Sequence, residues 1–274
     1  MPEPDQYAVM GNPVAHSKSP LIHQMFAEQC EQDLQYRAML VATDDFVNRV
    51  NDFASKGGKG LNITVPFKQE AWALAHKRSQ RAELAGAVNT LSWEQEQWSG
   101  DNTDGIGLVR DLINNHAVTL KDQRILLLGA GGAVRGVIEP LLQQGPQQIV
   151  IANRTVSKAV ELAALFSPYG KISASSFEDL DGLDFDLIIN GTAASLQGDV
   201  PPLPDNCIST DTVIYDMMYA AEPTAFMQWG LKRGVNKAID GLGMLVEQAA
   251  ESFYIWRKVR PQTQAVISHL REHM

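Results

Sequence analysis

Short apolar runs alternate with longer amphipathic stretches along nearly the whole chain, and this alternation limits the possible folds more than any other feature. Each apolar run has the length of one strand and is followed by Gly, Asn or Asp, whereas each amphipathic stretch has the length of a helix. Such repetition is typical of βαβ units, in which helices cover the faces of a parallel sheet. The sequence therefore predicts an α/β protein.

The expected elements fall into two groups. The first comprises strands at 7–10, 35–41 and 60–65, helices at 20–30, 44–55 and through 75, and a hairpin of 90–93 with 97–99. The second comprises strands at 125–128, 148–152, 186–189 and 213–215 and helices at 133–143 and 157–166. Glycines precede a linking helix near 104–107, and the last long helix is expected to begin near Gly241. We therefore expect domain boundaries at these two places.

Composition and charge exclude several classes of protein. Hydrophobic residues make up 45% and charged residues 20% of the 274 residues, which is globular rather than disordered usage. The 23 basic and 32 acidic residues give a net charge of −9, so no nucleic-acid partner is expected. No apolar run approaches the ~18 residues that span a bilayer, and no secretion signal is expected at the start. Because Cys30 and Cys207 form no C-x-x-C motif, we predict a cytoplasmic protein without membrane association.

A glycine-rich turn follows the strand expected at 125–128. The turn reads Gly129-Ala130-Gly131-Gly132-Ala133 and leads into an apolar helix. Glycine lets a pyrophosphate approach the N–H groups at a helix N-terminus, because no Cβ stands in the way. The G-x-G-x-x-G spacing fails at Val134, so the string by itself is also compatible with a turn that binds no nucleotide.

The end of the next strand indicates which dinucleotide this turn would bind. It carries Asn153-Arg154-Thr155, with Lys158 about one turn later. Proteins that bind NAD place an acidic side chain here for the ribose 2′-hydroxyl. A guanidinium, a hydroxyl and an ammonium instead suit a 2′-phosphate, which a carboxylate would repel. The sequence therefore predicts NADP as the cofactor.

Two serines lie at the start of the first expected helix. Ser19 is expected to cap a helix that begins at Pro20. Capping alone would explain Ser19, but two hydroxyls at a helix N-terminus can also bind a small carboxylate. Ser17 and Ser19 are therefore candidate ligands for an acidic substrate.

Further polar residues cluster around the strand expected at 60–65. Asn62 and Thr64 alternate with apolar residues, so they should share one face of the strand and need partners there. Lys68 follows the strand, where an open α/β sheet has its ligand crevice, and it is either catalytic or a solvated surface lysine. Asn89 and Asp104, taken singly, are typical turn residues.

Eight strings of the sequence together resemble those of the shikimate dehydrogenase family and extend over almost the whole chain. They are SKSP at 17–20, NITVPFK at 62–68, GAVNT at 86–90, DNTDG at 101–105, GAGGA at 129–133, NRT at 153–155, YDMMY at 215–219 and DGLGMLVEQA at 240–249. The resemblance implies an N-terminal α/β substrate domain of residues 1–104 with 242–274, and a Rossmann-like, doubly wound NADP-binding domain of residues 105–241.

The resemblance also implies an activity and the residues that perform it. The activity is the reversible NADPH-dependent reduction of 3-dehydroshikimate to shikimate, on the route to chorismate and the aromatic amino acids. Lys68 and Asp104 would be catalytic, with Lys68 as the acid/base. The implied substrate-binding residues are Ser17, Ser19, Thr64, Lys68, Asn89, Asp104, Tyr219 and Gln248. The implied cofactor-binding residues are Gly129, Ala130, Gly131, Gly132, Ala133, Asn153, Arg154, Thr155, Lys158, Met217 and Gly241.

Two alternatives remain open from the sequence. One is a quinate/shikimate dehydrogenase of broader specificity, although two serines at 17 and 19 and the basic Arg154 favour shikimate and NADP. Another is a silent NADP- or shikimate-binding regulator, which would have no reason to keep both Lys68 and Asp104. A metal site at His269-x-x-Glu-His273 is not expected, because the motif lies where a terminal helix frays. The chain is expected to be a monomer or a homodimer.

Overall fold

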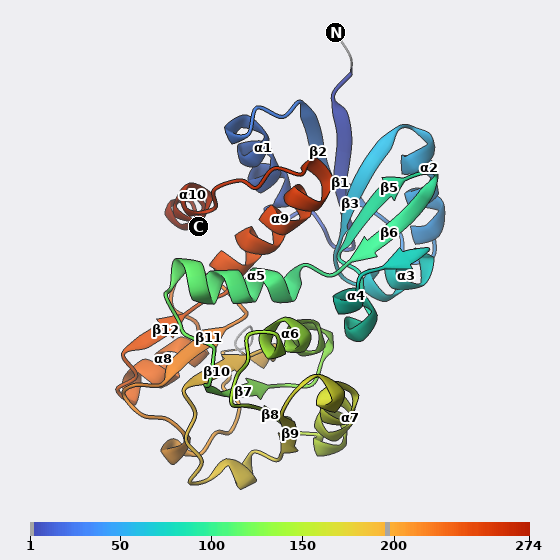
Figure 1. The fold of residues 1–274 in the computed structure, drawn as a ribbon. Coiled ribbons are helices and arrows are strands. Elements are labelled where there is room, and N and C mark those ends of the chain that lie inside the picture. Colours follow the sequence, from blue (N-terminus) through green and yellow to red (C-terminus); the bar gives the residue numbers. More distant parts are fainter. Residues whose placement is uncertain (1–2, 195–197) are drawn as a thin grey trace. The chain divides into compact units, whose positions relative to one another are not determined.

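The computed structural model describes residues 3–194 and 198–274 and confirms an α/β fold (Figure 1). The chain forms two compact units, one of residues up to Gly107 with Val246–His269 and one of Leu108–Leu245 with Leu270–Met274. Three helices contain residues of both units: α5 (Asp104–Arg110), α9 (Leu242–Arg257) and α10 (Gln264–Glu272). Among the described residues, no helix is long and apolar enough to cross a bilayer.

The first unit is built on a mixed six-stranded sheet with the order β2-β1-β3-β5-β6-β4. Its strands are β1 (Asp5–Gly11), β2 (Leu34–Leu40), β3 (Gly58–Ile63), β4 (Lys77–Arg78), β5 (Thr90–Glu94) and β6 (Gln97–Asp101). Its remaining helices are α1 (Ser19–Gln29), α2 (Phe46–Ser55), α3 (Lys68–Leu74) and α4 (Gln80–Ala85). Strand β1 is parallel to β2 and β3, as βαβ units require, whereas β5 is antiparallel to both β3 and β6.

The hairpin of β5 and β6 confirms the sequence prediction and determines which strand ends meet. Gln95 and Glu96 adopt φ values of 52° and 59°, the left-handed conformation that a two-residue hairpin turn uses. Because β5 reverses direction, its first residue, Thr90, pairs with Asn62 near the end of β3 and with Asp101 at the end of β6. Polar residues from three strands therefore meet at one edge of the sheet.

The end of β3 differs from the prediction. The strand ends at Ile63 rather than at residue 65, because the Thr64 carbonyl accepts a hydrogen bond from the Phe67 N–H at 3.0 Å and the chain turns. Val65, which the alternation would place on the face opposite Asn62 and Thr64, is 69% exposed. The Val65–Pro66 peptide within this turn is cis.

Packing of Phe67 fixes the start of the next helix. Phe67 is fully buried and stacks on Phe46 of α2, with ring centroids 4.8 Å apart and an interplanar angle of 9°. The two rings belong to an apolar core that includes Met10 of β1 and Leu61 of β3. Full burial of a Phe side chain stabilises the fold by roughly 1.5–3 kcal/mol. Lys68 follows Phe67 directly, so this core holds the lysine at the sheet edge.

The second unit is a parallel six-stranded sheet with the order β12-β11-β10-β7-β8-β9. Its strands are β7 (Arg124–Leu128), β8 (Gln148–Ala152), β9 (Ile172–Ser175), β10 (Leu187–Asn190), β11 (Val213–Asp216) and β12 (Lys237–Ile239), and its helices are α6 (Gly132–Leu142), α7 (Val156–Phe166) and α8 (Ala225–Lys232). Counted from its first strand this is the 3-2-1-4-5-6 order of a doubly wound fold, with the switch point between β7 and β10. The predicted Rossmann-like topology is confirmed.

The linking helix begins earlier than predicted. We expected glycines to precede it, but α5 begins at Asp104 and contains Gly105 and Gly107. It continues into a π-helical turn, Asp111–Asn115. Short elements such as β4, with the sequence Lys-Arg, were not predicted because they have no apolar run or periodicity to reveal them.

Candidate active site

An ion pair joins the two residues expected to be catalytic. Lys68 begins α3, Asp104 begins α5, and Lys68 Nζ lies 2.6 Å from Asp104 Oδ2. The Lys68 side chain is 33% exposed and that of Asp104 17%, so the pair is partly shielded and accessible to a small molecule. The backbone helps to hold Lys68, because its carbonyl accepts the Val88 N–H at 2.9 Å. A charge-assisted bond in this setting can orient an acid/base group.

Asn89 connects this ion pair to α9. Its Nδ2 donates to Asp104 Oδ1 at 2.8 Å and lies 3.5 Å from Gln248 Oε1. Asp104 therefore accepts Lys68 on one carboxylate oxygen and Asn89 on the other. Lys68, Asn89, Asp104 and Gln248 are widely separated in the sequence and form one continuous polar group in the fold.

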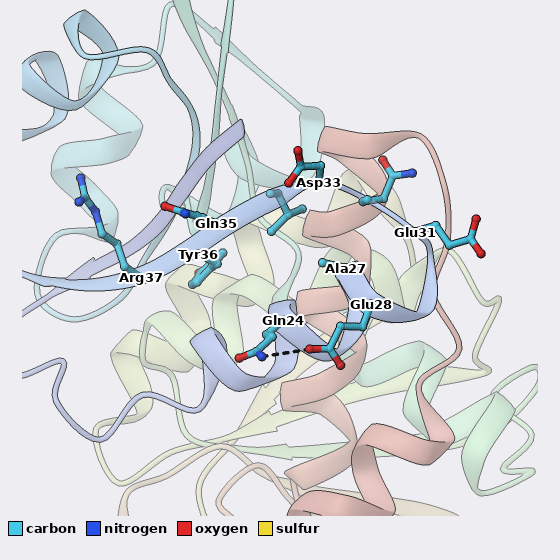
Figure 2. A pocket seen from close by; sticks show the side chains of 10 residues that line it. Gln24, Ala27, Glu28, Glu31, Asp33, Gln35, Tyr36 and Arg37 are labelled. Atoms are coloured by element: carbon cyan, nitrogen blue, oxygen red, sulfur yellow. Dashed lines mark hydrogen bonds between the residues drawn. The ribbon is translucent and has the colours of Figure 1, made fainter. Parts of the chain in front are cut away.

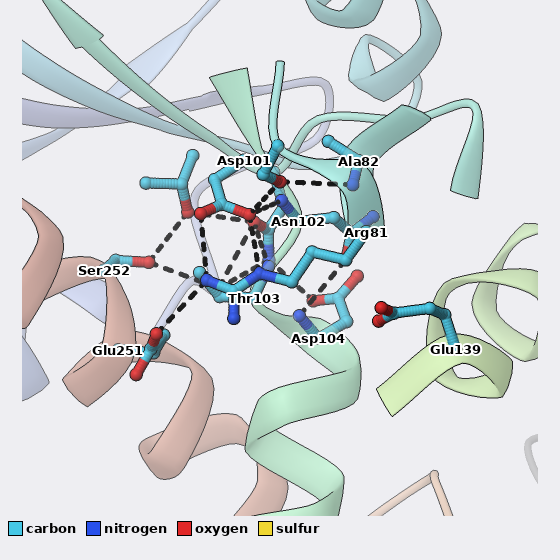
Figure 3. A network of polar contacts seen from close by, with 12 residues as sticks. Arg81, Ala82, Asp101, Asn102, Thr103, Asp104, Glu139, Glu251 and Ser252 are labelled. Carbon is cyan, nitrogen blue, oxygen red and sulfur yellow. Dashed lines mark hydrogen bonds and ion pairs between the residues drawn. The ribbon is translucent and has the colours of Figure 1, made fainter. Parts of the chain in front are cut away.

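A second network holds the loop that carries Asp104 (Figure 3). Arg81 of α4 binds Asp101 with two bonds, Nε to Oδ1 at 2.7 Å and Nη2 to Oδ2 at 2.9 Å. Arg81 Nη2 also lies 3.1 Å from Glu251 Oε1 on α9. The loop continues with Asn102, whose Oδ1 accepts the Asp104 N–H at 3.2 Å. Arg81 thus ties the end of β6 to α9 just before the loop reaches Asp104.

The two serines lie where predicted, but their capping roles differ. Lys18 occupies the N-cap position of α1, which begins at Ser19 rather than Pro20, and Ser19 makes no capping bond. Ser17 Oγ instead accepts the Ser19 N–H at 3.3 Å. Ser17 lies two residues before Ser19, on the approach to the helix. Both side chains are partly exposed, as carboxylate ligands must be.

Ser19 is linked to the sheet through Tyr36 of β2. Burial raises the pKa of Tyr36 well above 10, and a hydrogen bond from Ser19 opposes this shift. The Tyr36 hydroxyl donates to Asn62 Oδ1 at 2.8 Å.

Thr64 follows β3, and its Cγ2 lies against Gly11, where a Cβ would be 2.3 Å from it. Glycine at position 11 therefore lets the Thr64 side chain occupy this end of the sheet.

The glycine turn of the second unit has the geometry of an anion-binding site. Gly129 adopts φ 105°, and Gly131 is the N-cap of α6 in extended conformation. A Cβ added to Gly131 or Gly132 would meet no atom within 4 Å, so the space in front of the helix N-terminus is open. Gly131, Gly132 and Ala133 are exposed there. The turn lies at the switch point of the sheet, and its residues fit a pyrophosphate.

The predicted 2′-phosphate residues gather at the end of the neighbouring strand. The Gly129 N–H donates to the Ala152 carbonyl at 2.8 Å, which places the end of β8 beside the glycine turn. Arg154, Thr155 and Lys158 follow Ala152 and are exposed. Asn153 is partly buried and donates from Nδ2 to the Thr155 carbonyl at 2.8 Å, which shapes the loop between β8 and α7. A basic, accessible loop of this kind suits a phosphate dianion.

Met217 and Gly241 meet at the carboxyl end of β11. A Cβ on Gly241 would lie 2.3 Å from the Met217 carbonyl oxygen, so only glycine permits this approach. Tyr219 lies two residues beyond Met217 and lines a cavity of about 370 Å³. Burial, assisted by the nearby Asp240 carboxylate, raises the pKa of Tyr219, so its hydroxyl stays neutral and can donate.

A larger cavity of about 720 Å³ lies between α1 and the edge strand β2 (Figure 2). None of the predicted site residues lines it. Its charged lining consists of Glu28, Glu31, Asp33 and Arg37, three acids against one base, which would repel a carboxylate substrate. The polar group around Lys68, rather than this cavity, is therefore the candidate active site.

Sequence reasoning missed several residues that support the site. Thr90 and Ser252 are buried polar residues that contact Asn89 or Asn62, and Arg81 anchors Asp101. Asn62 itself is 7% exposed and has five side-chain contacts, which confirms that a polar residue on this strand needs partners. The string Asn89-Thr90 is the sequence signal that could have drawn attention to Thr90. No sequence signal indicates that residue 252 lies near Thr90.

His269 and His273 belong to the motif for which no metal site was expected. Among the residues that the structure describes, there is no group of three or more potential metal ligands.

Comparison with known proteins identifies three family models that match this chain. Residues 9–91 match the shikimate dehydrogenase substrate binding domain, residues 111–197 match shikimate / quinate 5-dehydrogenase, and residues 241–271 match the shikimate 5′-dehydrogenase C-terminal domain. Shikimate dehydrogenase (NADP(+)) of Hahella chejuensis is 57% identical over 268 residues, which is 98% of this chain and 99% of that protein. The corresponding protein of Marinobacter nauticus is 56% identical over 271 residues, 97% of this chain and 98% of its own.

Solved structures agree with these matches. Shikimate 5-dehydrogenase of Thermus thermophilus, in complex with NADP(H) and shikimate, superimposes with a TM-score of 0.87 at 30% identity. The match covers 98% of this chain and all of that one. The similarity therefore extends over both units of the fold.

Proposed function

The chain belongs to the shikimate dehydrogenase family, and we propose that it interconverts 3-dehydroshikimate and shikimate with NADP as the hydride carrier. The observation that carries this proposal is the Lys68–Asp104 ion pair of 2.6 Å, in the unit that matches the substrate-binding domain of the family. A protein that only bound the ligand would need neither an acid/base group nor a carboxylate to orient it.

Lys68 moves the proton of the reaction. In the direction of reduction, the substrate carbon gains a hydride and its carbonyl oxygen gains a proton, which the Lys68 ammonium donates. In the reverse direction the hydroxyl proton returns to Lys68. Bound NADPH or NADP+ supplies or accepts the hydride. Asp104 holds Nζ in place through Oδ2, and its other oxygen is held by Asn89, so the pair is oriented before substrate arrives.

Polar residues around the pair would bind the rest of the substrate. Ser17 and Ser19 bind the carboxylate, assisted by the N-terminus of α1. Ring hydroxyls or the reacting oxygen bind Thr64, Asn89, Asp104 and Gln248 of the first unit. Tyr219, a residue of the second unit with a neutral hydroxyl, is proposed as a further substrate ligand. Each group can donate or accept a hydrogen bond to a hydroxyl, so a polyhydroxylated acid is the substrate class that these residues fit.

The second unit would bind the cofactor. The turn from Gly129 to Ala133 receives the pyrophosphate, because two of its glycines leave open space before a helix N-terminus. Asn153, Arg154, Thr155 and Lys158 bind the adenosine end and its 2′-phosphate. Met217 and Gly241 border the nicotinamide. The free cysteines Cys30 and Cys207 are compatible with a cytoplasmic location, which we also propose.

Steady-state assays of both acids with both cofactors test this proposal. Formation of NADPH from shikimate and NADP+ should exceed the rates with quinate or with NAD+, measured as kcat/KM. Preference for quinate with NAD+ would establish the broader enzyme instead. Ligand binding by calorimetry without turnover in any combination would establish a silent binding protein.

A further inference from the structure

Behind the proposed active site lies a group of buried hydroxyls that none of the roles above uses. Thr90 is 1% exposed and Ser252 is fully buried, and their hydroxyl oxygens lie 2.8 Å apart. Thr90 begins β5 directly after Asn89, and Ser252 lies one turn after Gln248 on α9. Buried hydroxyls require hydrogen-bond partners, so the direction of each bond can be followed.

The Asn89 amide can have only one orientation. Its Oδ1 accepts the backbone N–H of Thr103 at 2.9 Å, and a backbone N–H can only donate. Oδ1 therefore lies on that side, and Nδ2 is left to donate to Asp104 Oδ1 at 2.8 Å. If the amide rotated by half a turn, its oxygen would face the Asp104 carboxylate and both groups would repel each other.

Thr90 supplies a second donor to the same amide oxygen. Its hydroxyl donates to Asn89 Oδ1 at 2.8 Å. Having used its one proton, Thr90 Oγ1 can only accept from Asn62 Nδ2, which lies 3.2 Å away. Ser252 Oγ lies 2.8 Å from Thr90 Oγ1 and 3.1 Å from the Gln248 carbonyl, so its one proton can go to either acceptor. Asn62 Nδ2 also lies 3.0 Å from Ser252 Oγ and 3.2 Å from the Asn89 carbonyl, which can only accept and so fixes Nδ2 on this side of the amide.

Asn62 is itself held in one orientation. Its Oδ1 accepts the Tyr36 hydroxyl at 2.8 Å and lies 3.2 Å from Nε2 of His23. Burial lowers the pKa of His23 to about 3, so the imidazole is neutral. Because Asn62 Oδ1 can only accept, the bond between them assigns the ring proton to Nε2. A directed series of bonds thus runs from His23 and Tyr36 through Asn62 and Thr90 to Asn89.

We propose that Thr90 is a positioning residue, whose hydroxyl, together with the Thr103 N–H, holds the Asn89 amide and through it the Asp104 carboxylate that orients Lys68. This inference rests on the proposed function. Thr90 does not need to contact substrate for this role, since it acts through Asn89. The hydroxyl carries the effect, and the methyl group of Thr90 contributes only packing.

Two substitutions of Thr90 separate the effect of its hydroxyl from the effect of its side-chain shape. Thr90→Val keeps the branched shape and removes the hydroxyl, whereas Thr90→Ser keeps the hydroxyl and removes the methyl. Shikimate oxidation by NADP+ should lose about tenfold or more in kcat with Thr90→Val, which corresponds to about 1.4 kcal/mol of transition-state stabilisation. Thr90→Ser should keep kcat within about twofold, and KM for NADP+ should change in neither variant.

Thr212→Val is the matched control. Thr212 is 2% exposed and its hydroxyl donates to the Phe185 carbonyl at 2.9 Å, so the same buried hydroxyl is removed from the second unit. Its kcat should remain that of the wild type, although its unfolding free energy falls. Rates are compared per folded molecule, with the folded fraction taken from urea unfolding.

The outcomes distinguish the two proposals. If the wild type oxidises shikimate and Thr90→Val is as active as Thr90→Ser, the positioning role of Thr90 is wrong and the proposed function stands. If Thr90→Ser loses activity and Thr90→Val keeps it, Thr90 acts through packing alone. If the wild type itself shows no turnover, the proposed function has failed.

Discussion

Acidification is expected to destabilise the first unit through His23, which lies on α1 and is 1% exposed. Burial lowers the pKa of its imidazole from 6.5 to about 3, although the bond to Asn62 acts in the opposite direction. The folded protein keeps His23 neutral where the unfolded chain protonates it. The stability that His23 contributes is therefore complete above pH 6.5 and is lost progressively as the pH falls toward 3.

The magnitude follows from these two pKa values. Each pH unit within this window costs about 1.4 kcal/mol, because the unfolded state binds one more proton than the folded state. Between about pH 7.5 and about pH 5, His23 alone should lower the free energy of unfolding by about 2 kcal/mol. This is a large share of the roughly 5–15 kcal/mol that stabilises a typical domain.

Two variants isolate the effect. His23→Phe removes the titrating group and retains a ring to stack on Tyr36, whose centroid lies 4.2 Å from that of His23. Asn62 Oδ1 keeps its 2.8 Å bond from Tyr36 in this variant. His23→Gln also removes the titration but keeps an N–H donor toward Asn62. Urea unfolding is followed by tryptophan fluorescence, which reports mainly the first unit because it holds Trp72, Trp93, Trp98 and Trp256.

On acidification over this range, the free energy of unfolding of both variants should fall by about 2 kcal/mol less than that of the wild type. Parallel pH dependence in all three proteins would refute the reasoning, since it would mean that His23 is protonated equally in the folded and unfolded states. A reduced slope in His23→Phe but not in His23→Gln would point to the hydrogen bond rather than to the proton.

Three substitutions in the second unit, one of them a control, test cofactor binding. Gly132→Ala places a methyl in open space at the start of α6, so the unfolding free energy should be kept or raised by up to about 1 kcal/mol while KM for NADP+ rises about tenfold or more. Gly230→Ala, whose methyl would lie 2.2 Å from Ile214 Cδ1, should lower the unfolding free energy and leave KM for NADP+ unchanged. Equal KM values in the two variants would contradict the pyrophosphate assignment. Arg154→Ala should lower kcat/KM for NADP+ by about tenfold to a hundredfold and leave that for NAD+ nearly unchanged. Equal losses with both cofactors would contradict a 2′-phosphate contact.

Much of the fold could be predicted because apolar periodicity records burial directly. The strand at 148–152 has the predicted bounds, and the βαβ repeats predict the parallel sheet of the second unit, whereas its doubly wound order was expected from the family resemblance. Prediction was wrong where a local contact decides the chain direction. Val65 continues the alternation of β3 in sequence, but the bond from Phe67 to Thr64 ends the strand first.

The candidate site likewise has residues that could be predicted from the sequence and residues that could not. The serines, the glycine turn and Lys68 can be found because they follow strand or helix ends that periodicity reveals. The residues that hydrogen-bond to these groups cannot be predicted from strand and helix ends, because contacts across the sheet depend on strand register and on the direction of β5. Thr90 lies opposite Asn62 because β5 pairs antiparallel with β3, although α3, β4 and α4 separate these two strands in the sequence. No motif in the sequence indicates that Ser252 of α9 or Arg81 of α4 reaches the site.

The central claim is that Lys68 transfers the proton while the cofactor transfers the hydride, and turnover of Lys68→Ala at saturating shikimate and NADP+ tests it most directly. The interaction of Lys68 with the reacting oxygen is made chiefly in the transition state, so kcat should fall by about 10²–10⁴ while KM for shikimate changes little. Binding of NADP+, which involves the second unit, should be unchanged. A Lys68→Ala variant with a kcat close to that of the wild type would contradict the account.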